Sequence, residues 1–207
     1  CCVQNTISAT SRLYPVSCRE RVLLCANFTF DNSVYTIWST WSAGAALCVV
    51  RKDVILENGA DVIVDLEISR IFVTTSQLGL FDGGTKTALH TAIQAGEALT
   101  ATATKAWLQP TGVLVNAYGP TECAVDFTGT HLHANTANSP SIGKPFPNAR
   151  AFIGASLIGE LCIEGGQVGR GYCNRGEETA RFFCCSSHSR GSRQYRTGDL
   201  CRWLPDG

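Results

Sequence analysis

The chain has 207 residues, of which 17 are basic and 17 acidic, so its formal net charge is zero. No cluster of Lys and Arg is present, which argues against a nucleic-acid or membrane-surface partner. No apolar run reaches the roughly 18 residues that a membrane span needs. The sequence contains no methionine, and we interpret it as an internal piece of a larger polypeptide. Its 11 cysteines are odd in number and include no Cys-x-x-Cys pair, which favours reduced thiols in a cytoplasmic protein over a disulfide scaffold or a zinc site.

The first part of the chain predicts a parallel α/β sheet. Residues 1–20 are polar and are expected to be irregular. Apolar segments predict strands at 21–28, 46–50, 71–74, 89–95 and 113–118. Apolar residues at helical spacing predict helices at 31–42 and 100–108. Strands alternating with helices are typical of a parallel sheet, whose ligands bind at the carboxyl ends of the strands.

From about residue 141 the sequence changes to short strands broken by glycine-rich turns. Strands are predicted at 149–153, 159–164 and 199–203. We therefore expect an irregular segment at 1–20, an α/β core at 21–140 and a smaller β-rich subdomain at 141–207.

The most informative loop follows the strand predicted at 113–118. It reads Asn-Ala-Tyr-Gly-Pro-Thr-Glu over residues 116–122. An ordinary tight turn accounts for Gly-Pro, but it does not require the tyrosine, threonine and glutamate. An aromatic ring can stack on a base, and Mg²⁺ prefers a few carboxylate oxygens together with substrate phosphates. We interpret the loop as a nucleotide and magnesium site. Asp199, in Thr-Gly-Asp, is a further carboxylate suited to sugar hydroxyls, although such turns also use aspartate structurally.

These motifs resemble those of a known family. The loop 116–122, GELCIEGGQVGRGY at 159–172 and YRTGDL at 195–200 resemble, in order, core motifs of the adenylation domains of nonribosomal peptide synthetases, within the acyl-adenylate-forming superfamily. Residues 30–34, 95–99 and 142–145 resemble further motifs of these domains. The resemblance spans roughly residues 21–207. It implies a fragment of the large N-terminal adenylation subdomain, with a parallel sheet flanked by helices and followed by a smaller β-rich subdomain.

The resemblance also implies the residues that bind ATP or AMP. Tyr118 would stack on adenine, Thr121 would contact phosphate and Asp199 would accept the ribose hydroxyls. Glu122 would hold Mg²⁺ and, with Thr121, would be catalytic. The full set expected to bind the nucleotide is Asn116, Tyr118, Gly119, Thr121 and Asp199.

The amino-acid substrate would be held by a second set. Asp31 would bind its α-ammonium group, because a buried carboxylate needs a cationic partner; alternatively Asp31, Asn32 or Ser33 caps the following helix. The remaining pocket residues are expected to be Asn32, Tyr35, Phe72, Ile93, Ala95, Gly96, Ala117, Val125 and Asp126. A buried Asp126 would indicate a substrate side chain with a donor or a positive charge, whereas an ordinary, partly exposed Asp126 is an equal alternative.

The implied parent enzyme joins an amino acid to AMP, releases pyrophosphate and uses Mg²⁺. It then passes the amino acid to the phosphopantetheine thiol of a carrier domain, beside condensation domains. The family's phosphate-wrapping loop and its C-terminal subdomain with a catalytic lysine are not found in the sequence, so the isolated chain is expected to be inactive. Two alternatives stay open. One is an acyl- or aryl-CoA ligase, against which Asp31 argues because such substrates lack an α-ammonium group. The other is a non-catalytic remnant that binds nucleotide at most.

Two other patterns imitate functional sites. Residues 84–87, Gly-Thr-Lys-Thr, differ from a P-loop because a threonine separates the glycine from the lysine. His131 and His133 alternate along a strand, but without a third ligand nearby we expect surface histidines rather than a metal site.

Overall fold

The computed structural model describes residues 2–81, 88–108, 112–133, 141–153, 158–185 and 193–202. Within these ranges the side chains of residues 158, 184–185, 193–194 and 198–202 are outside the description. The segment 84–87, which imitates a P-loop in the sequence, lies outside the described residues. Among the helices described, none has the length and apolar content required to cross a membrane.

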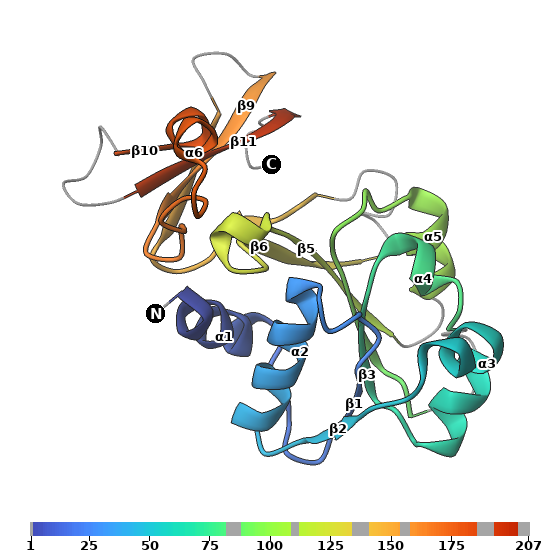
Figure 1. Ribbon diagram of the computed structural model, residues 1–207. Helices are drawn as coiled ribbons and strands as arrows, with labels where there is room; N and C mark the ends of the chain where they lie inside the picture. Colours follow the sequence, from blue (N-terminus) through green and yellow to red (C-terminus); the bar gives the residue numbers. More distant parts are fainter. Residues whose placement is uncertain are drawn as a thin grey trace.

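In the described residues, a seven-stranded sheet forms the centre of the molecule (Figure 1). Its order is β2 (Ala46–Cys48), β1 (Arg21–Leu23), β3 (Arg70–Val73), β4 (Thr91–Gln94), β5 (Val113–Tyr118), β6 (Thr128–Leu132) and β7 (Lys144–Pro145). The strands from β2 to β5 are parallel, whereas β6 is antiparallel to β5 and β7 to β6. The parallel sheet predicted from the sequence is therefore confirmed.

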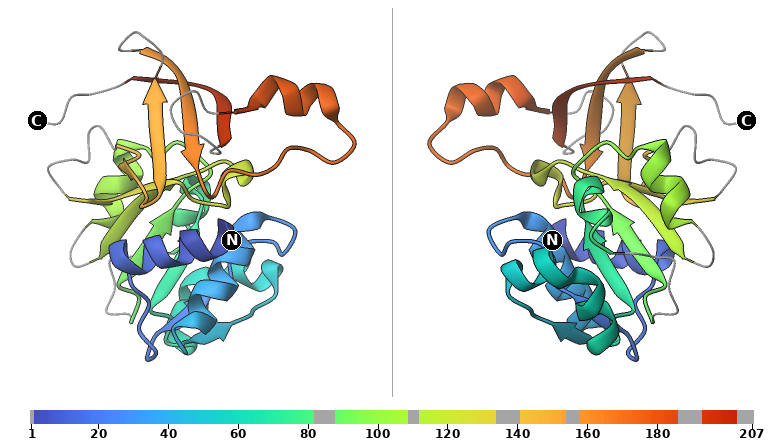
Figure 2. Two further views of the ribbon diagram at one scale, coloured as in Figure 1. Left: turned by 90° about the vertical axis from the view of Figure 1, so that its left-hand side faces the viewer. Right: turned by 90° about the vertical axis from the view of Figure 1, so that its right-hand side faces the viewer.

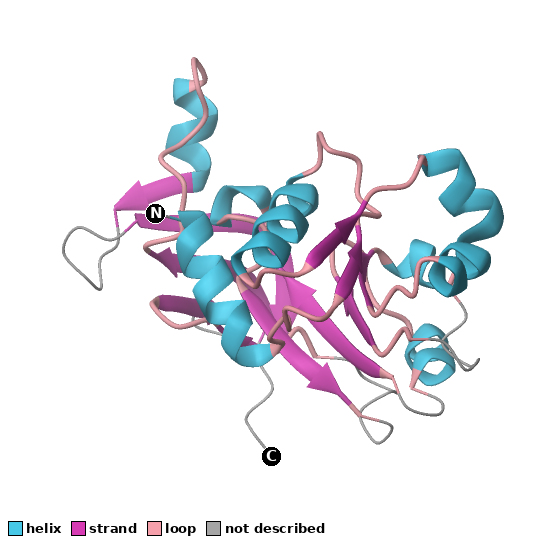
Figure 3. Ribbon diagram, turned by 90° about the horizontal axis from the view of Figure 1, so that it is seen from below, coloured by secondary structure: helices cyan, strands magenta, loops and turns pink. Residues whose placement is uncertain are grey.

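Helices cover both faces of this sheet, as Figures 1 and 3 show. On one face lie α1 (Cys2–Leu13) and α2 (Asp31–Ser42). On the other lie α3 (Lys52–Asp65), α4 (Thr75–Leu78) and α5 (Ala101–Trp107). Because parallel sheets are buried on both faces, their strands are apolar throughout rather than alternating with polar residues, which explains the continuous apolar segments in the sequence.

Successive strand residues point to opposite faces and divide the core in two. Ile71 of β3 and Leu114 of β5 pack on the side of α3 and α5. Their neighbours Phe72 and Val115 pack on the opposite side, where Tyr35 of α2 joins them. The second cluster is the one that contains residues expected to bind substrate.

A second, antiparallel sheet follows, in the order β10 (Phe183–Cys185), β11 (Arg193–Arg202), β9 (Ile158–Gly165) and β8 (Ala149–Ile153). Figure 2 shows this sheet at one end of the molecule, with α6 (Gly176–Phe182) standing to its side. The β-rich texture predicted for the end of the chain is present, and the domain boundary at residue 141 stays a prediction.

The expectation of an irregular N-terminal segment is wrong, because residues 2–13 form α1. This helix buries small and hydroxylated residues, Thr6, Ala9 and Thr10, instead of large apolar ones. The Thr10 hydroxyl donates to the carbonyl of Thr6 at 2.9 Å, one turn back. A helix that satisfies its buried hydroxyls on its own backbone leaves no apolar periodicity in the sequence. The strand expected at 21–28 is also shorter, since β1 ends at Leu23.

Candidate nucleotide and amino-acid site

Three polar loops lie at the carboxyl edge of the parallel strands, where ligands of such sheets bind. The loop before Asp31 follows β1, Gly96 follows β4, and the loop that begins at Gly119 follows β5. Gly96 has a φ of 82°, a left-handed conformation that favours glycine. A Cβ there would lie 3.8 Å from the ring of Phe30, so the first two loops approach each other closely.

The loop from Gly119 to Phe127 turns the chain from β5 into the antiparallel strand β6. The N–H of Phe127 donates to the carbonyl of Tyr118 at 2.8 Å and closes it. A Cβ on Gly119 would lie 2.3 Å from the carbonyl oxygen of Val125. Only glycine allows this close approach of backbone to backbone.

Two residues of this loop have strained backbones. Ala124 and Val125 have φ angles of 62° and 77°, and a positive φ is a true outlier for a β-branched residue. Such conformations persist only where surrounding contacts hold them, and they are concentrated at functional sites. One such contact comes from α1, where the Thr6 hydroxyl donates to the carbonyl of Ala124 at 2.9 Å.

Gln167 holds the same loop from the opposite direction. Its side chain is fully buried, and its Nε2 donates to the carbonyls of Cys123 and Asp126, both at 2.9 Å. Its Oε1 accepts from Nδ2 of Asn5 on α1 at 2.8 Å. The side-chain amide of Gln167 therefore joins the turn after β9 to the strained loop and to α1.

The apolar residues predicted to line the substrate pocket form one buried cluster with Tyr14 and Val115, which we call the tyrosine cluster. The predicted members are Tyr35, Phe72, Ile93, Ala95, Ala117 and Val125. The ring of Tyr35 meets Tyr14 and Phe72 edge-on, with centroid distances of 6.3 and 5.2 Å. The fold thus gathers residues from α2, three neighbouring strands and the strained loop.

Asp126 lies against this cluster and is fully buried. Of the two alternatives left open for Asp126, the buried carboxylate is therefore the one observed, and the partly exposed one is wrong. The Tyr14 hydroxyl donates to Oδ2 of Asp126 at 3.3 Å, whereas Oδ1 has no hydrogen-bond partner among the described residues. Burial raises the pKa of Asp126 to about 7, against the opposing effect of the Tyr14 hydrogen bond; the charge of Asp31 adds to the rise.

Asp31 occupies the first turn of α2, where a negative charge is favoured by the helix dipole. The N-cap is Phe30, in an extended conformation and without a side-chain hydrogen bond. The prediction that Asp31, Asn32 or Ser33 caps the helix is therefore wrong. The Ser33 hydroxyl instead donates to the carbonyl of Phe28 at 3.2 Å, and no hydrogen bond from a described residue reaches the carboxylate of Asp31.

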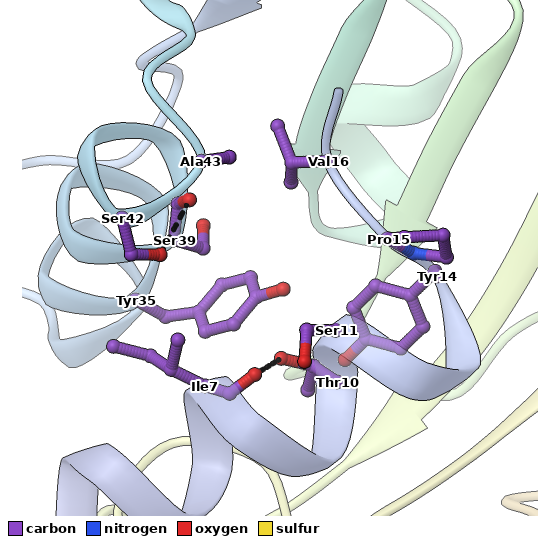
Figure 4. Close-up of a pocket in the computed structure, with 10 residues that line it drawn as sticks. All are labelled: Ile7, Thr10, Ser11, Tyr14, Pro15, Val16, Tyr35, Ser39, Ser42 and Ala43. Carbon is purple, nitrogen blue, oxygen red and sulfur yellow. Dashed lines mark hydrogen bonds between the residues drawn. The ribbon is translucent and has the colours of Figure 1, made fainter. Parts of the chain in front are cut away.

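Two cavities adjoin the predicted substrate residues. One of about 160 Å³ lies at the carboxyl edge beside Asn32 and Phe30, with Thr74 and Lys52 on its other walls. The other, of about 290 Å³, lies between α1 and α2. Figure 4 shows the Tyr35 ring reaching across from α2 toward Tyr14, with hydroxyl groups of both helices around the space. Asp126 lines neither of these two cavities.

Glu122 lies on the other side of the strained loop, in the short helix η1 (Thr121–Cys123). Its Oε1 accepts from the hydroxyl of Tyr172 at 2.5 Å. Burial and then this hydrogen bond raise the pKa of Tyr172, so the phenol keeps its proton and remains a donor. The rings of Tyr172, Phe183 and Tyr195 continue this contact to β11, with centroid distances of 5.4 and 5.0 Å.

The other residues expected to bind nucleotide have varied positions. Tyr118 is half-buried and packs on the core beneath the second sheet, and Thr121 is exposed. Asn116 is buried, and its Nδ2 donates to the carbonyl of Ser141 at 2.7 Å. The backbone of Asp199 lies where the pairing of β11 with β9 shifts register, but its side chain lies outside the described residues. The roles expected for Tyr118, Thr121 and Asp199 in nucleotide binding stay predictions.

With this geometry established, comparison with known proteins identifies the family. Residues 2–173 match the family described as AMP-binding enzyme. The chain belongs to the AMP-binding enzyme family. It is 35% identical over 197 residues to nonribosomal peptide synthetase 7 of Aspergillus fumigatus, covering 91% of this chain and 8% of that protein. Bacitracin synthase 3 of Bacillus licheniformis is 31% identical over 215 residues, covering 99% of this chain and 3% of that protein.

A solved structure shares the fold. The crystal structure of the Vibrio cholerae adenylation domain AlmE, in complex with glycyl-adenosine-5'-phosphate, matches with a TM-score of 0.85 and 26% identity. The match covers 96% of this chain and 41% of that chain. The resemblance to adenylation domains is thus confirmed, and the chain spans less than a tenth of the length of the two synthetases.

Magnesium is the metal that this AMP-binding fold implies, and Glu122 suits it. Mg²⁺ is usually held by one or two carboxylates and substrate phosphates rather than by an all-protein cage. Tyr172 uses one lone pair of Oε1, which leaves other acceptor sites on the same carboxylate. In the described part of the chain, no group of three or more His, Cys, Asp or Glu residues is arranged to hold a metal. His131, considered above as a ligand, has its Nε2 2.6 Å from the carbonyl oxygen of Leu13.

Three residues that shape the site were not predicted from the sequence. Tyr172 stands at the end of the motif 159–172, so the motif pointed to it without giving its partner. Gln167 lies in the same motif, but no local signal indicates that its amide reaches the strained loop. Tyr14 lies in a segment expected to be irregular, and its contact with Asp126 joins residues 112 apart in sequence.

Proposed function

We propose that this chain is the substrate-binding core of an adenylation domain that activates an amino acid in a nonribosomal peptide synthetase. The reaction joins the amino-acid carboxylate to the α-phosphate of ATP and releases pyrophosphate. One observation carries the proposal: a single strained loop directs Glu122 to one side and Asp126, with the tyrosine cluster, to the other. An enzyme that joins a nucleotide to an amino acid needs such adjacent sites, because catalysis of this kind depends mainly on positioning.

The residues present have distinct tasks in this proposal. Tyr118 supplies an aromatic face for adenine, and Thr121, exposed on η1, supplies a hydroxyl for phosphate. Asp199 is the acceptor for the ribose hydroxyls. Glu122 holds Mg²⁺, which when bound supplies positive charge against the phosphate oxygens. Asp31 pairs with the α-ammonium group; its place in the first turn of α2 and its lack of a described hydrogen bond support this role.

The proposed partners are other domains of the same synthetase. The activated amino acid passes to the phosphopantetheine thiol of a carrier domain, next to a condensation domain. Similarity to synthetases from a fungus and a bacterium supports this arrangement. A cytoplasmic location is supported by the free, buried thiols of Cys25 and Cys123, because thiols stay reduced in that compartment.

The test is ATP–pyrophosphate exchange by a complete adenylation domain that carries residues 1–207. We expect exchange with at least one amino acid and none with fatty or aryl acids. Exchange supported only by acids without an α-amino group would overturn the proposal in favour of a CoA ligase. Asp31→Asn keeps the size of the side chain and removes its charge. It should lower kcat/KM for every amino acid, since each presents the same ammonium group.

A second measurement separates an active site from a remnant. Calorimetric titration of the 207-residue chain with ATP and Mg²⁺ asks whether the nucleotide side folds and binds on its own. Binding that Glu122→Gln weakens would support the assignment of the metal-holding residue. Exchange absent from the complete domain, with no amino acid active, would leave a non-catalytic remnant as the conclusion.

A further inference from the structure

Only one oxygen of the Asp126 carboxylate has a hydrogen-bond partner among the described residues. The carboxylate is fully buried beside the apolar tyrosine cluster, and the Tyr14 hydroxyl reaches one oxygen while the other has no described partner. Leaving a buried polar atom unpaired is unfavourable, and more so when the group is charged. A site of this kind persists when a ligand supplies the missing partner.

A second carboxylate, that of Asp31, interacts electrostatically with Asp126. The charge of Asp31 reaches Asp126 and disfavours its ionisation. The cation that acts on the neighbouring Tyr35 is Arg70, which is already engaged, because its Nε lies 2.5 Å from Oε2 of Glu20 in a buried ion pair. Among the described residues, no ion pair joins a cation to the carboxylate of Asp31 or of Asp126.

We propose that the substrate is an amino acid whose side chain ends in a second ammonium group, of the ornithine and lysine class. This inference rests on the proposed function, in which Asp31 pairs with the α-ammonium group. Asp126 then receives the side-chain ammonium on Oδ1, while Tyr14 continues to hold Oδ2. A diamino acid brings two positive groups to two negative ones, which removes the repulsion between the carboxylates when it binds.

The rest of the cluster fits the methylene chain of such a substrate. Phe72, Ile93 and Ala117 are apolar and buried, so they favour CH₂ groups and offer nothing to a polar stem. The rings of Tyr14 and Tyr35 border the cavity of about 290 Å³, which gives them space to move outward when a ligand separates the packed side chains. Asp126 borders neither cavity, so a substrate reaches this specificity-determining residue when these side chains move apart around it.

The test compares substrates that differ only in the terminal amine. A complete adenylation domain that carries residues 1–207 is assayed with ornithine against norvaline and with lysine against norleucine. We expect kcat/KM for at least one amine to exceed that of its apolar partner by about a hundredfold or more, because a site with a buried polar group rejects an analogue that leaves it unpaired. Asp126→Asn should reduce this ratio to within about tenfold, because it removes the charge and nearly preserves the shape.

The matched control is Asp31→Asn. It should lower kcat/KM for the amine and its apolar partner alike, so the ratio between them stays close to that of the parent domain. An apolar amino acid preferred over both diamino acids would overturn the inference while leaving amino-acid activation intact. A preference for glutamine or serine would do the same, since it would show a neutral donor in place of the ammonium group.

Direct binding keeps the inference testable if no exchange is found. Calorimetry of the same domain with ornithine, lysine, norvaline and norleucine measures recognition without chemistry. Tighter binding of an amine, lost in Asp126→Asn, would support the inference even if the proposed function fails. Equal binding of amines and apolar analogues would overturn it.

Discussion

Glu122 and Asp126 lie on the same loop but in opposite environments. Glu122 is half-buried, accepts a hydrogen bond from Tyr172 and has lone pairs left for a ligand. Asp126 is fully buried, and one of its oxygens is unpaired. The backbone between them passes through the positive φ angles of Ala124 and Val125. The reversal sends one carboxylate toward the second sheet and the other toward the tyrosine cluster.

The difference shows how one short segment can serve two chemistries. Burial, rather than residue type, disfavours ionisation of the Asp126 carboxylate and raises its pKa. On the nucleotide side, Glu122 must reach metal and solvent. On the substrate side water is excluded, so the unpaired oxygen of Asp126 favours a substrate that can donate to it. Both sides depend on the loop conformation, so variants of the loop should affect both and variants of a single carboxylate only one.

Gly119→Ala should give the largest effect. Its Cβ would lie 2.3 Å from the carbonyl oxygen of Val125 and 2.7 Å from the nitrogen of Phe127, and backbone atoms cannot move aside as a side chain does. We expect the free energy of unfolding to fall by about 5 kcal/mol, at the upper end for single substitutions. Urea denaturation measures it. Gly79→Ala, with nothing within 4 Å of the added carbon, is the control, and an equal effect of both variants would contradict the close approach.

Asp126→Asn should stabilise the chain in a pH-dependent way. The pKa of Asp126 is about 7 in the folded protein, against an ordinary 3.8, so between these values the folded state holds a proton that the unfolded state has lost. Stability therefore falls as pH rises from about 4 to 7. An asparagine does not titrate, so the stability of Asp126→Asn does not fall in this way. Its free energy of unfolding relative to the parent chain should therefore rise from near zero at pH 4 to about 4 kcal/mol at pH 8, taking 1.36 kcal/mol for each pKa unit.

Thermal denaturation at several pH values measures this advantage. The titratable groups that face Asp126 are Tyr14, which donates to it, and Asp31, whose charge opposes its ionisation; Tyr35 keeps its proton because burial raises its pKa to about 12. The control is Asp61→Asn, at an exposed position of α3, which should show no such growth. If the difference in stability between Asp126→Asn and the parent chain stayed constant across the pH range, it would contradict a raised pKa for a buried Asp126.

Glu122→Gln should act on rate rather than stability. The amide oxygen can still accept from Tyr172, so the loop keeps its shape while the charge is lost. In the complete adenylation domain we expect pyrophosphate exchange to fall about a hundredfold for every amino acid, the usual loss for one electrostatic contact. Glu177→Gln, at an exposed position of α6, should leave the rate unchanged. An unaltered rate in Glu122→Gln would remove this residue from the metal site.

Sequence patterns within a few residues predicted the strands of the parallel sheet, because the conformation of a strand depends mainly on its own residues. The alternation of Ile71, Phe72 and Val73 between two cores follows from strand geometry, and β-branched and aromatic segments marked β3, β4 and β5. The tyrosine cluster also agrees with the residues that the family resemblance pointed to, although their contact with substrate stays a prediction.

One failure is local: the capping rule favoured a polar residue at the start of α2, yet Phe30 occupies the N-cap and the Ser33 hydroxyl donates to the carbonyl of Phe28. The other failures depend on contacts distant in sequence. Nothing near Gln167 in sequence indicates that its amide lies under the strained loop. The burial of Asp126 likewise depends on α1, whose lack of apolar periodicity concealed the helix.

Gln167→Ala should give the next effect in size, through both sides of the loop at once. It removes the donors to the carbonyls of Cys123 and Asp126, and a buried carbonyl left unpaired costs about 1–3 kcal/mol. We expect a loss of about 2 kcal/mol in unfolding free energy. The KM for amino acid and the KM for ATP should both rise, because the two carboxylates move with the loop. A rise in only one KM would contradict a shared support.

Thr6→Val is the matched, smaller change, since it preserves shape and removes the hydroxyl that donates to Ala124. A neutral hydrogen bond contributes about 1 kcal/mol, so the loss should be about half that of Gln167→Ala. The two residues hold the same strained turn from α1 and from the turn after β9. Their effects should therefore not be additive in the double variant, because a loop already released by one substitution has less to lose from the other. Strict additivity, measured by urea denaturation of the four chains, would mean that the two contacts stabilise separate structures and that the loop is held by something else.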